Sequence, residues 1–204
     1  SDGGCPSLLL EGTATNLIPY SEDFSNASWS KGNLSLTSGF ISPSGDLTAY
    51  RIFENNLTGQ HKIQYTNINV AIGDITVSYF LKKGERDKIS IELGGGGGGQ
   101  AKFNLTSGIV ISQSGVIAKI EALSNDWYKC SVSFTTTATT VYTGAYLLDD
   151  SGNLSYTGDS LNGAYIYGAQ LEENSYSTSY IKTVGTTQTR VADTASGSGN
   201  STVI

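Results

Sequence analysis

The chain has 204 residues, of which 38% are hydrophobic and only 15% charged, and its net charge is −6. Ser (27), Thr (22) and Gly (25) make up more than a third of it, and it has 12 Tyr, 6 Phe and 2 Trp. This composition disfavours a helical bundle, a nucleic-acid backbone binder and a disordered linker. No apolar run is long enough to cross a membrane. We therefore expect one domain of a Ser/Thr/Gly-rich β protein of the surface or extracellular kind.

The first residues do not predict a regular element. Residues 1–15 have neither the basic start nor the long apolar core of a signal peptide, and we expect them to form an extension that packs on the domain. The one plausible helical piece follows at Ser21–Ala27, where Ser21 can cap and Glu22 and Asp23 suit a first turn. It predicts one short helical turn or two at most.

From residue 34 onward the apolar residues alternate with a period of two. In Ile75–Lys82, for example, Val77, Tyr79 and Leu81 share one face. About nine or ten short strands separated by turn residues predict an all-β protein, an antiparallel two-sheet β-sandwich. The predicted strands are Leu34–Phe40, Thr48–Phe53, His61–Ile68, Ile75–Lys82, Lys88–Leu93, Val116–Leu123, Trp127–Thr135, Val141–Leu148 and Ala164–Leu171.

Six consecutive glycines, Gly94–Gly99, follow one of these strands. They are not expected to form a phosphate-binding loop, because no Gly-Lys-Ser/Thr and no helical pattern come next. One interpretation is a loop whose backbone approaches a ligand closely. The other, which the ordering entropy of glycine favours, is a mobile hairpin loop between Ile89–Leu93 and Gln100–Leu105.

The sequence offers little for catalysis or metal binding. The two cysteines, Cys5 and Cys130, are expected to be free thiols, although a disulfide stays open. His61 is the only imidazole, and no nucleophile elbow is present. The adjacent carboxylates of Asp149-Asp150 and of Glu172-Glu173 would point to opposite faces of a strand, so neither pair can act as an acid/base couple alone. We expect a protein that is not an enzyme.

The C-terminal residues 185–204 are rich in Thr, Gly, Ser and Asn and have almost no apolar periodicity. This composition predicts a linker to a further module. The expected organisation is therefore an extension over 1–15, a sandwich over 16–184 and a linker over 185–204.

Several segments together resemble known families. Four of them are similar to the jelly-roll carbohydrate-binding modules of xylanases and cellulases: Asn16–Trp29, Thr76–Lys82, Asp126–Thr135 and Tyr165–Glu172. A broader match resembles a jelly-roll domain of marine bacteriophage tail and fibre proteins and related bacterial surface proteins; it is carried by Gly4–Glu11, Tyr20–Phe24, Gly168–Glu172, Thr178–Ile181 and Thr189–Asp193.

The resemblance implies a jelly-roll sandwich that binds a glycan on the concave face of one sheet, with a virion-surface, extracellular or cell-surface location. It also implies a structural calcium ion, but the positions that usually supply its acidic ligands are Ser25 and Gly168 here. Glu22 and Asp23 are the remaining candidate ligands for calcium. No other cofactor is expected.

The candidate ligand-binding residues are those expected on the outer faces of strands, chosen as aromatic rings for stacking and polar groups for hydrogen bonding. An outward patch of Phe80, Lys82 and Gln170 is the first choice, with Tyr167, Ala169 and Leu171 expected to face inward. Tyr142 and Tyr146 share one face, as do His61 and Tyr65. The full set is His61, Gln64, Phe80, Lys82, Tyr142, Tyr146 and Gln170.

The favoured function is a non-catalytic glycan-binding module of a phage fibre or bacterial surface protein, which recognises a host cell-surface or algal polysaccharide. Two alternatives stay open: a structural spacer or oligomerisation domain of a fibre, for instance a homotrimer, and a polysaccharide-cleaving enzyme. The low charge favours a neutral sugar over a polyanion as the ligand.

Overall fold

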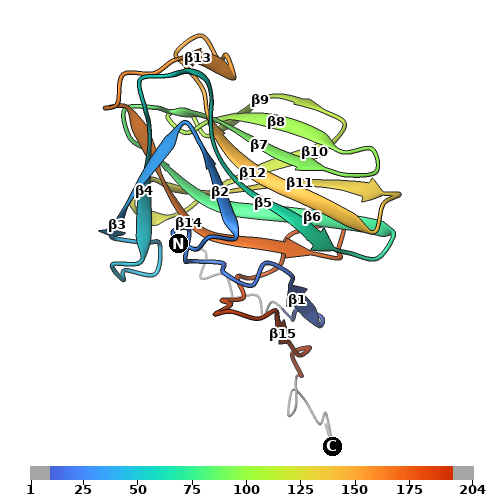
Figure 1. Ribbon diagram of the computed structural model, residues 1–204. Helices are drawn as coiled ribbons and strands as arrows, with labels where there is room; N and C mark the ends of the chain where they lie inside the picture. Colours follow the sequence, from blue (N-terminus) through green and yellow to red (C-terminus); the bar gives the residue numbers. More distant parts are fainter. Residues whose placement is uncertain (1–9, 195–204) are drawn as a thin grey trace, which may run out of the picture.

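The computed structural model describes residues 10–194, which form two antiparallel sheets packed face to face and a small two-stranded ribbon (Figure 1). The six-stranded sheet has the order β10-β11-β6-β14-β4-β3, and the seven-stranded sheet has the order β13-β5-β12-β7-β8-β9, with β2 paired to β5. The ribbon consists of β1 and β15. Among these residues the only helical element is one 3₁₀ turn, and no helix is long and apolar enough to cross a membrane.

The strands of the six-stranded sheet are β3 (Leu34–Phe40), β4 (Ala49–Glu54), β6 (Gly73–Lys83), β10 (Ile117–Ala122), β11 (Trp127–Thr136) and β14 (Gly163–Glu172). Those of the seven-stranded sheet are β2 (Trp29–Gly32), β5 (Thr58–Asn69), β7 (Lys88–Gly94), β8 (Gly99–Asn104), β9 (Ile109–Ser114), β12 (Thr140–Leu147) and β13 (Ser155–Thr157). The ribbon pairs β1 (Ala14–Asn16) with β15 (Gln188–Arg190), and the 3₁₀ turn is Ser124–Asp126.

The connections between the two sheets confirm the predicted jelly-roll sandwich. The chain crosses from one sheet to the other seven times, between β2 and β3, β4 and β5, β5 and β6, β6 and β7, β9 and β10, β11 and β12, and β13 and β14. The central strands β4-β14-β6-β11 therefore face β5-β12-β7-β8, which is the double Greek-key arrangement of eight jelly-roll strands. β9 and β10, which follow each other in the chain, add one edge strand to each sheet.

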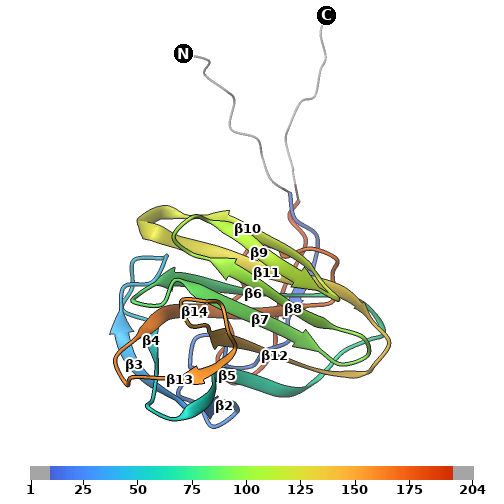
Figure 2. The same ribbon diagram turned by 90° about the horizontal axis from the view of Figure 1, so that it is seen from above.

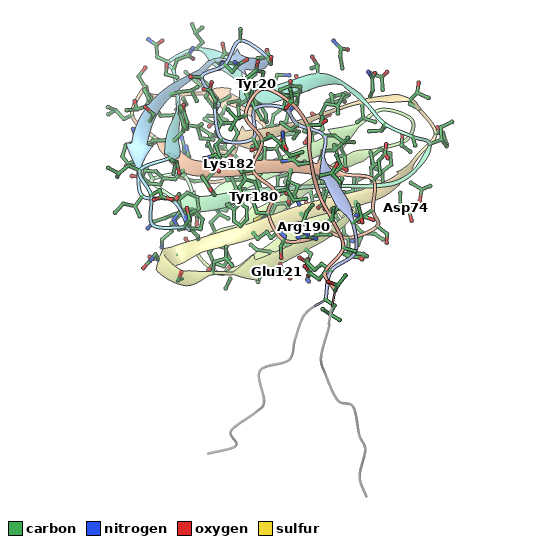
Figure 3. All side chains as sticks on the ribbon, turned by 90° about the horizontal axis from the view of Figure 1, so that it is seen from below. Tyr20, Asp74, Glu121, Tyr180, Lys182 and Arg190 are labelled. Atoms are coloured by element: carbon green, nitrogen blue, oxygen red, sulfur yellow. The ribbon has the colours of Figure 1, made fainter. Side chains whose placement is uncertain are left out.

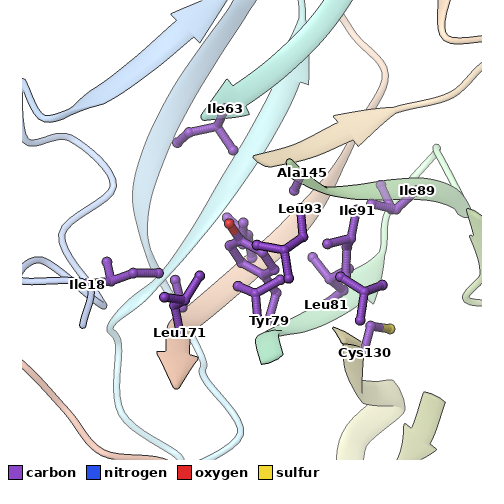
Figure 4. Packing of buried hydrophobic residues seen from close by; sticks show 14 of the residues in the cluster. Ile18, Ile63, Tyr79, Leu81, Ile89, Ile91, Leu93, Cys130, Ala145 and Leu171 are labelled. Atoms are coloured by element: carbon purple, nitrogen blue, oxygen red, sulfur yellow. The ribbon is translucent and has the colours of Figure 1, made fainter. Parts of the chain in front are cut away.

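The core lies between the sheets and is made by the alternating residues that the sequence predicted. Tyr79 and Leu81 from β6 pack against Ile89, Ile91 and Leu93 from β7 (Figure 4). All five are fully buried. Cys130 also points into this core as a free thiol, and burial raises the pKa of that thiol. Cys5 lies outside the described residues.

Three local predictions are wrong in ways that have a physical cause. Residues 21–27 form turns instead of a helical turn, because Asn26 N–H binds the Asp23 carbonyl and Trp29 N–H binds the Asn26 carbonyl. Tyr167 faces outward, because Gly168, at φ 56°, forms a bulge that inserts one extra residue before Ala169. The strands β1, β2, β9, β13 and β15 were not predicted, because each is short or lacks strong alternation with a buried face.

The two terminal segments cover part of the outer face of the six-stranded sheet. Tyr180 and Arg190 lie over its strands in the view from below (Figure 3), and Tyr180 packs on Phe80 and Tyr167. The segment expected to begin a linker therefore contains a strand, β15, which pairs with β1. The rest of the expected linker, 195–204, lies outside the described residues.

The Asn16 side chain fixes both terminal segments to the sandwich. Its amide nitrogen donates to the carbonyl oxygens of Ala169 (3.0 Å) and Ile181 (2.8 Å). Its amide oxygen accepts from the backbone N–H groups of Ile18 (3.1 Å) and Leu171 (3.2 Å). The fully buried amide thus uses all of its donors and two lone pairs.

Replacing Asn16 with Ala should lower the free energy of unfolding by about 3 kcal/mol, because it leaves buried backbone groups of three segments without partners. Urea denaturation of the purified domain measures this difference. Asn69→Ala is the matched control, since Asn69 is exposed on β5. Equal stability of the two variants would contradict the role given to Asn16.

Candidate functional site

Three of the predicted ligand-binding residues lie together on the outer face of the seven-stranded sheet. Tyr142 and Tyr146 point outward from β12, and Gln64 points outward from the neighbouring strand β5. Tyr142 and Gln64 are half-buried, whereas Tyr146 is 3% exposed. Figure 2 views the molecule from the side of this sheet, with β7 and β8 in front.

Glu92, on β7, is the residue at this face that the sequence analysis missed. Its carboxylate accepts a hydrogen bond from the hydroxyl of Tyr142 (2.9 Å) and another from the hydroxyl of Tyr146. The signal was present in the sequence, since Glu92 alternates with Ile91 and Leu93, which are buried. We call these three residues, Tyr142, Tyr146 and Glu92, the tyrosine platform.

The platform lies within two rows of residues that run across the sheet, and most of the other residues in these rows are polar. One row runs Gln64, Gly144, Glu92 and Gln100 on adjacent strands. The next row runs Lys62, Tyr146, Ser90 and Lys102. The Lys62 ammonium lies 5.4 Å from the centre of the Tyr146 ring, and Lys102 donates to the carbonyl of Gly152 (2.8 Å).

Two glycines make room for the two tyrosine rings. A Cβ at Gly94 would overlap the ring of Tyr142, and a Cβ at Gly144 would lie 3.2 Å from Cε2 of Tyr146. Each ring can lean toward Glu92 because the glycine beneath it has no side chain. The hydrogen bonds to Glu92 and the close contacts with Gly94 and Gly144 together hold the two tyrosine rings in one orientation.

The remaining glycines of Gly94–Gly99 form the predicted hairpin loop between β7 and β8, but the loop is anchored. The carbonyl oxygen of Gly96 accepts from Thr137 N–H (3.1 Å), and that of Gly95 accepts from the Thr136 hydroxyl (2.9 Å). Cβ atoms at Gly98 and Gly99 would overlap backbone oxygens of neighbouring strands. The run of glycines therefore permits this loop to pack closely against the backbone of neighbouring segments.

His61 lies on the same strand as Gln64 but points to the opposite side. It is fully buried, with Nδ1 2.7 Å from the Asn33 carbonyl oxygen and Nε2 3.2 Å from the Tyr156 carbonyl oxygen. Its ring also packs on Tyr156, with the ring centres 4.5 Å apart. Both ring nitrogens are engaged within the protein, so His61 is not part of an exposed binding face.

The patch expected from Phe80, Lys82 and Gln170 is not exposed as a unit. All three point away from the core as predicted, but Phe80 lies under Tyr167 and Tyr180 and is only 8% exposed. Gln170 is fully buried, and its amide binds Ile181 N–H (2.6 Å) and the Ser179 carbonyl (3.3 Å). The sequence analysis failed here because it expected nothing to cover this face. Lys82 alone remains half-buried.

The two candidate calcium ligands are both engaged with other side chains of the protein. Glu22 pairs with the Lys182 ammonium (2.6 Å) and accepts from the hydroxyls of Tyr167 (2.8 Å) and Tyr180 (3.3 Å). Asp23 accepts from Ser25, whose hydrogen bond is the main cause that lowers the pKa of this carboxyl. Calcium needs six to eight oxygen ligands, and residues 10–194 contain no group of three acidic, His or Cys side chains that could hold a metal.

No protein-family model and no curated protein matches the sequence. Several solved structures are similar to this chain, among them the following three. The carbohydrate-binding module TmCBM61, solved with beta-1,4-galactotriose, has a TM-score of 0.47 and 10% identity over 78% of this chain and 99% of its own. The Clostridium thermocellum xylanase 10B fragment with CBM22-1 and GH10 modules, solved with xylohexaose, has a TM-score of 0.46 and 10% identity over 84% of this chain.

The third structure is the enzymatically active domain of tailspike protein 4 of bacteriophage CBA120, with a TM-score of 0.43 and 9% identity over 76% of this chain. The present chain spans only 30% of the xylanase fragment and 21% of the tailspike domain. Because these likenesses are remote, the jelly-roll assignment rests on the strand topology, and the candidate site rests on its own geometry.

Because of the tyrosine platform, the free energy of unfolding should fall as the pH rises into the alkaline range. Burial raises the pKa of Tyr146, and the bond to Glu92 raises it further. Tyrosines of the unfolded chain release their protons near pH 10. The stabilisation of the folded state by the protonated Tyr146 hydroxyl is therefore complete below about pH 10 and is lost as the pH rises further. Tyr146→Phe should flatten the fall in unfolding free energy by up to about 1.4 kcal/mol per pH unit.

Urea denaturation of the native protein and of Tyr146→Phe, at several pH values from about 9 upward, measures the two slopes. Identical slopes would show that the Tyr146 proton is held no more tightly in the folded protein than in the unfolded chain.

Proposed function

We propose that this chain is a non-catalytic glycan-binding module of a phage fibre or bacterial surface protein, and that it holds a saccharide on the tyrosine platform. The observation that carries the proposal is the pair of outward tyrosines pinned to Glu92, with Gln64, Lys62 and the other polar side chains around them. The jelly-roll topology and the resemblance of the sequence to carbohydrate-binding modules support it.

The platform suits a sugar because it joins an apolar surface to planar polar groups. The half-buried Tyr142 ring can stack on the C–H face of a pyranose, while Gln64 and Gln100 can hydrogen-bond its hydroxyl groups. The rings lose little freedom on binding, because the Glu92 bonds and the close contacts with the two glycines already hold them. This pre-organisation favours binding of a neutral saccharide.

The polar side chains that could serve catalysis are engaged in structural roles. Glu172 is buried and accepts from the N–H (3.1 Å) and hydroxyl of Thr178. Asp149 accepts from Ser151 (3.0 Å) and Asn153 (2.7 Å) in the loop before β13. His61 is enclosed as described above. These engagements favour a binding role over cleavage of the polysaccharide.

Tyr142→Ala should weaken glycan binding by about tenfold or more, because it removes the stacking ring and one of the two bonds that orient Glu92. A glycan array of neutral plant and algal polysaccharides identifies the ligand, and titration calorimetry then compares the variants. Tyr176→Ala is the matched control, since Tyr176 is 65% exposed near the opposite sheet. Absence of any array hit and of binding to host envelopes would overturn the proposal, as would equal loss in both variants.

A fibre spacer is the second candidate function, and the β9 edge strand favours it. Its sequence has no charged residue, and Ile109 and Ile111 are 53% and 44% exposed on one side of it. An uncharged, exposed edge strand is a template for pairing with another chain. A spacer of this kind should be a stable trimer by light scattering, and Ile111→Lys should dissociate it; a monomeric native protein would contradict this candidate.

A further inference from the structure

The six-stranded sheet carries an aromatic cavity at the end that the terminal segments leave uncovered. The cavity has a volume of about 400 Å³, within the 300–1,000 Å³ typical of small-molecule sites. Its walls include Phe40, Trp127 and Tyr165, and the exposed side chains of Ile41 (60%) and Leu47 (68%) lie at its rim. It lies on the opposite sheet from the tyrosine platform.

A β-bulge builds one wall of this cavity. Leu34 and Leu36 point toward the core, so regular alternation along β3 would also turn Phe40 inward. Gly39, at φ 94°, shifts the register between Ser38 and Phe40. Phe40 therefore lies on the outer face, where its ring centre is 5.1 Å from that of Tyr165.

Lys82 is the only charged residue that lines the cavity. In the sheet register it stands between Trp127 and Tyr165 on adjacent strands. Its ammonium donates to the Asn125 carbonyl oxygen (2.9 Å), and no carboxylate among residues 10–194 forms an ion pair with it. An ammonium group has three donors, so Lys82 keeps donors available on a protein whose net charge is −6.

We propose that this cavity is a second saccharide subsite and that it takes a pyranose ring bearing a carboxylate, as in a uronic acid residue. The aromatic walls suit the C–H face of the ring, and Lys82 pairs with the carboxylate in a charge-assisted hydrogen bond. A neutral sugar leaves the ammonium without a counter-charge, so the same ring with a carboxylate binds more tightly.

The two tryptophans of the chain provide a direct readout. Trp127 lines the cavity, whereas Trp29 is buried in the main core with its indole N–H bound to the Tyr20 carbonyl (2.9 Å). In ¹⁵N-labelled protein, sodium D-galacturonate should shift the indole cross-peak of Trp127 saturably and leave that of Trp29 unchanged. D-galactose at the same concentrations should bind several-fold more weakly.

Lys82→Gln should weaken galacturonate binding by about tenfold, because it removes the charge and keeps a polar side chain of similar length. Lys62→Gln is the matched control, since Lys62 is equally half-buried but lies beside the tyrosine platform. Tyr142→Ala should leave galacturonate binding intact, which separates failure of this subsite from failure of the platform. An unchanged Trp29 cross-peak confirms the fold of each variant.

Four results would overturn the subsite: no saturable shift of Trp127, equal affinity for galactose and galacturonate, equal affinity in Lys82→Gln and the native protein, or equal loss in Lys62→Gln. Sodium benzoate is the last probe, because it has an apolar ring and a carboxylate but no hydroxyl groups. If it binds as tightly as galacturonate, the cavity recognises carboxylates without selecting a sugar, and the assignment fails.

Discussion

The four hydrogen bonds of the Asn16 amide determine which face of the sandwich is free. They join the N-terminal segment to β14 and to the chain around Ile181, so both terminal segments are held across the outer face of the six-stranded sheet. Phe80 and Gln170 are covered as a result. Within residues 10–194, neither terminal segment crosses the tyrosine platform of the seven-stranded sheet, and the position of the candidate site follows from this asymmetry.

A buried ion pair has a comparable role at one end of the platform. Arg86 binds the fully buried Glu54 through two nitrogens, each 2.9 Å from a carboxylate oxygen, and Glu54 also accepts from the Tyr156 hydroxyl (2.7 Å). Arg86 reaches Asp150 as well (3.0 Å), in the loop whose Gly152 carbonyl binds Lys102. Removing one partner of such a pair leaves an uncompensated buried charge, which is strongly destabilising. The ion pair thus positions the loop that orients Lys102 beside the platform.

The sequence predicted the sandwich because strand alternation is a local property. Val77, Tyr79 and Leu81 were placed inward correctly, and the grouping of Tyr142 with Tyr146 was also correct. The errors came from interactions that alternation does not encode. A single glycine, Gly168, reverses the direction of Tyr167, and Tyr180, from a segment rich in Ser and Thr, covers Phe80.

The hydrogen-bond partners of a polar side chain could likewise not be predicted from the sequence. Glu92 is recognisable as an outward residue of its strand, but only the fold brings it to Tyr142 and Tyr146, some fifty residues away along the chain. Histidine is a side-chain type that often binds ligands, yet the His61 side chain points into the protein and is fully buried. Alternation placed Tyr142 and Tyr146 on one face of their strand, and the fold brings Gln64 of β5 beside them; their role in ligand binding stays a prediction.

The β1–β15 ribbon has a mechanical consequence. Its strands are antiparallel, and beyond them Glu11 and Asp193 lie side by side, joined by Asp193 N–H to the Glu11 carbonyl (2.9 Å). Tension applied at these two points acts across the strands, so the pairs separate one after another, from Ala14–Arg190 to Asn16–Gln188. The side chains of Glu11 and Arg190 also bind Ser179, so these contacts must break as well before the load reaches the Asn16 amide. The ribbon and its contacts to Ser179 therefore bear such a load before either sheet does.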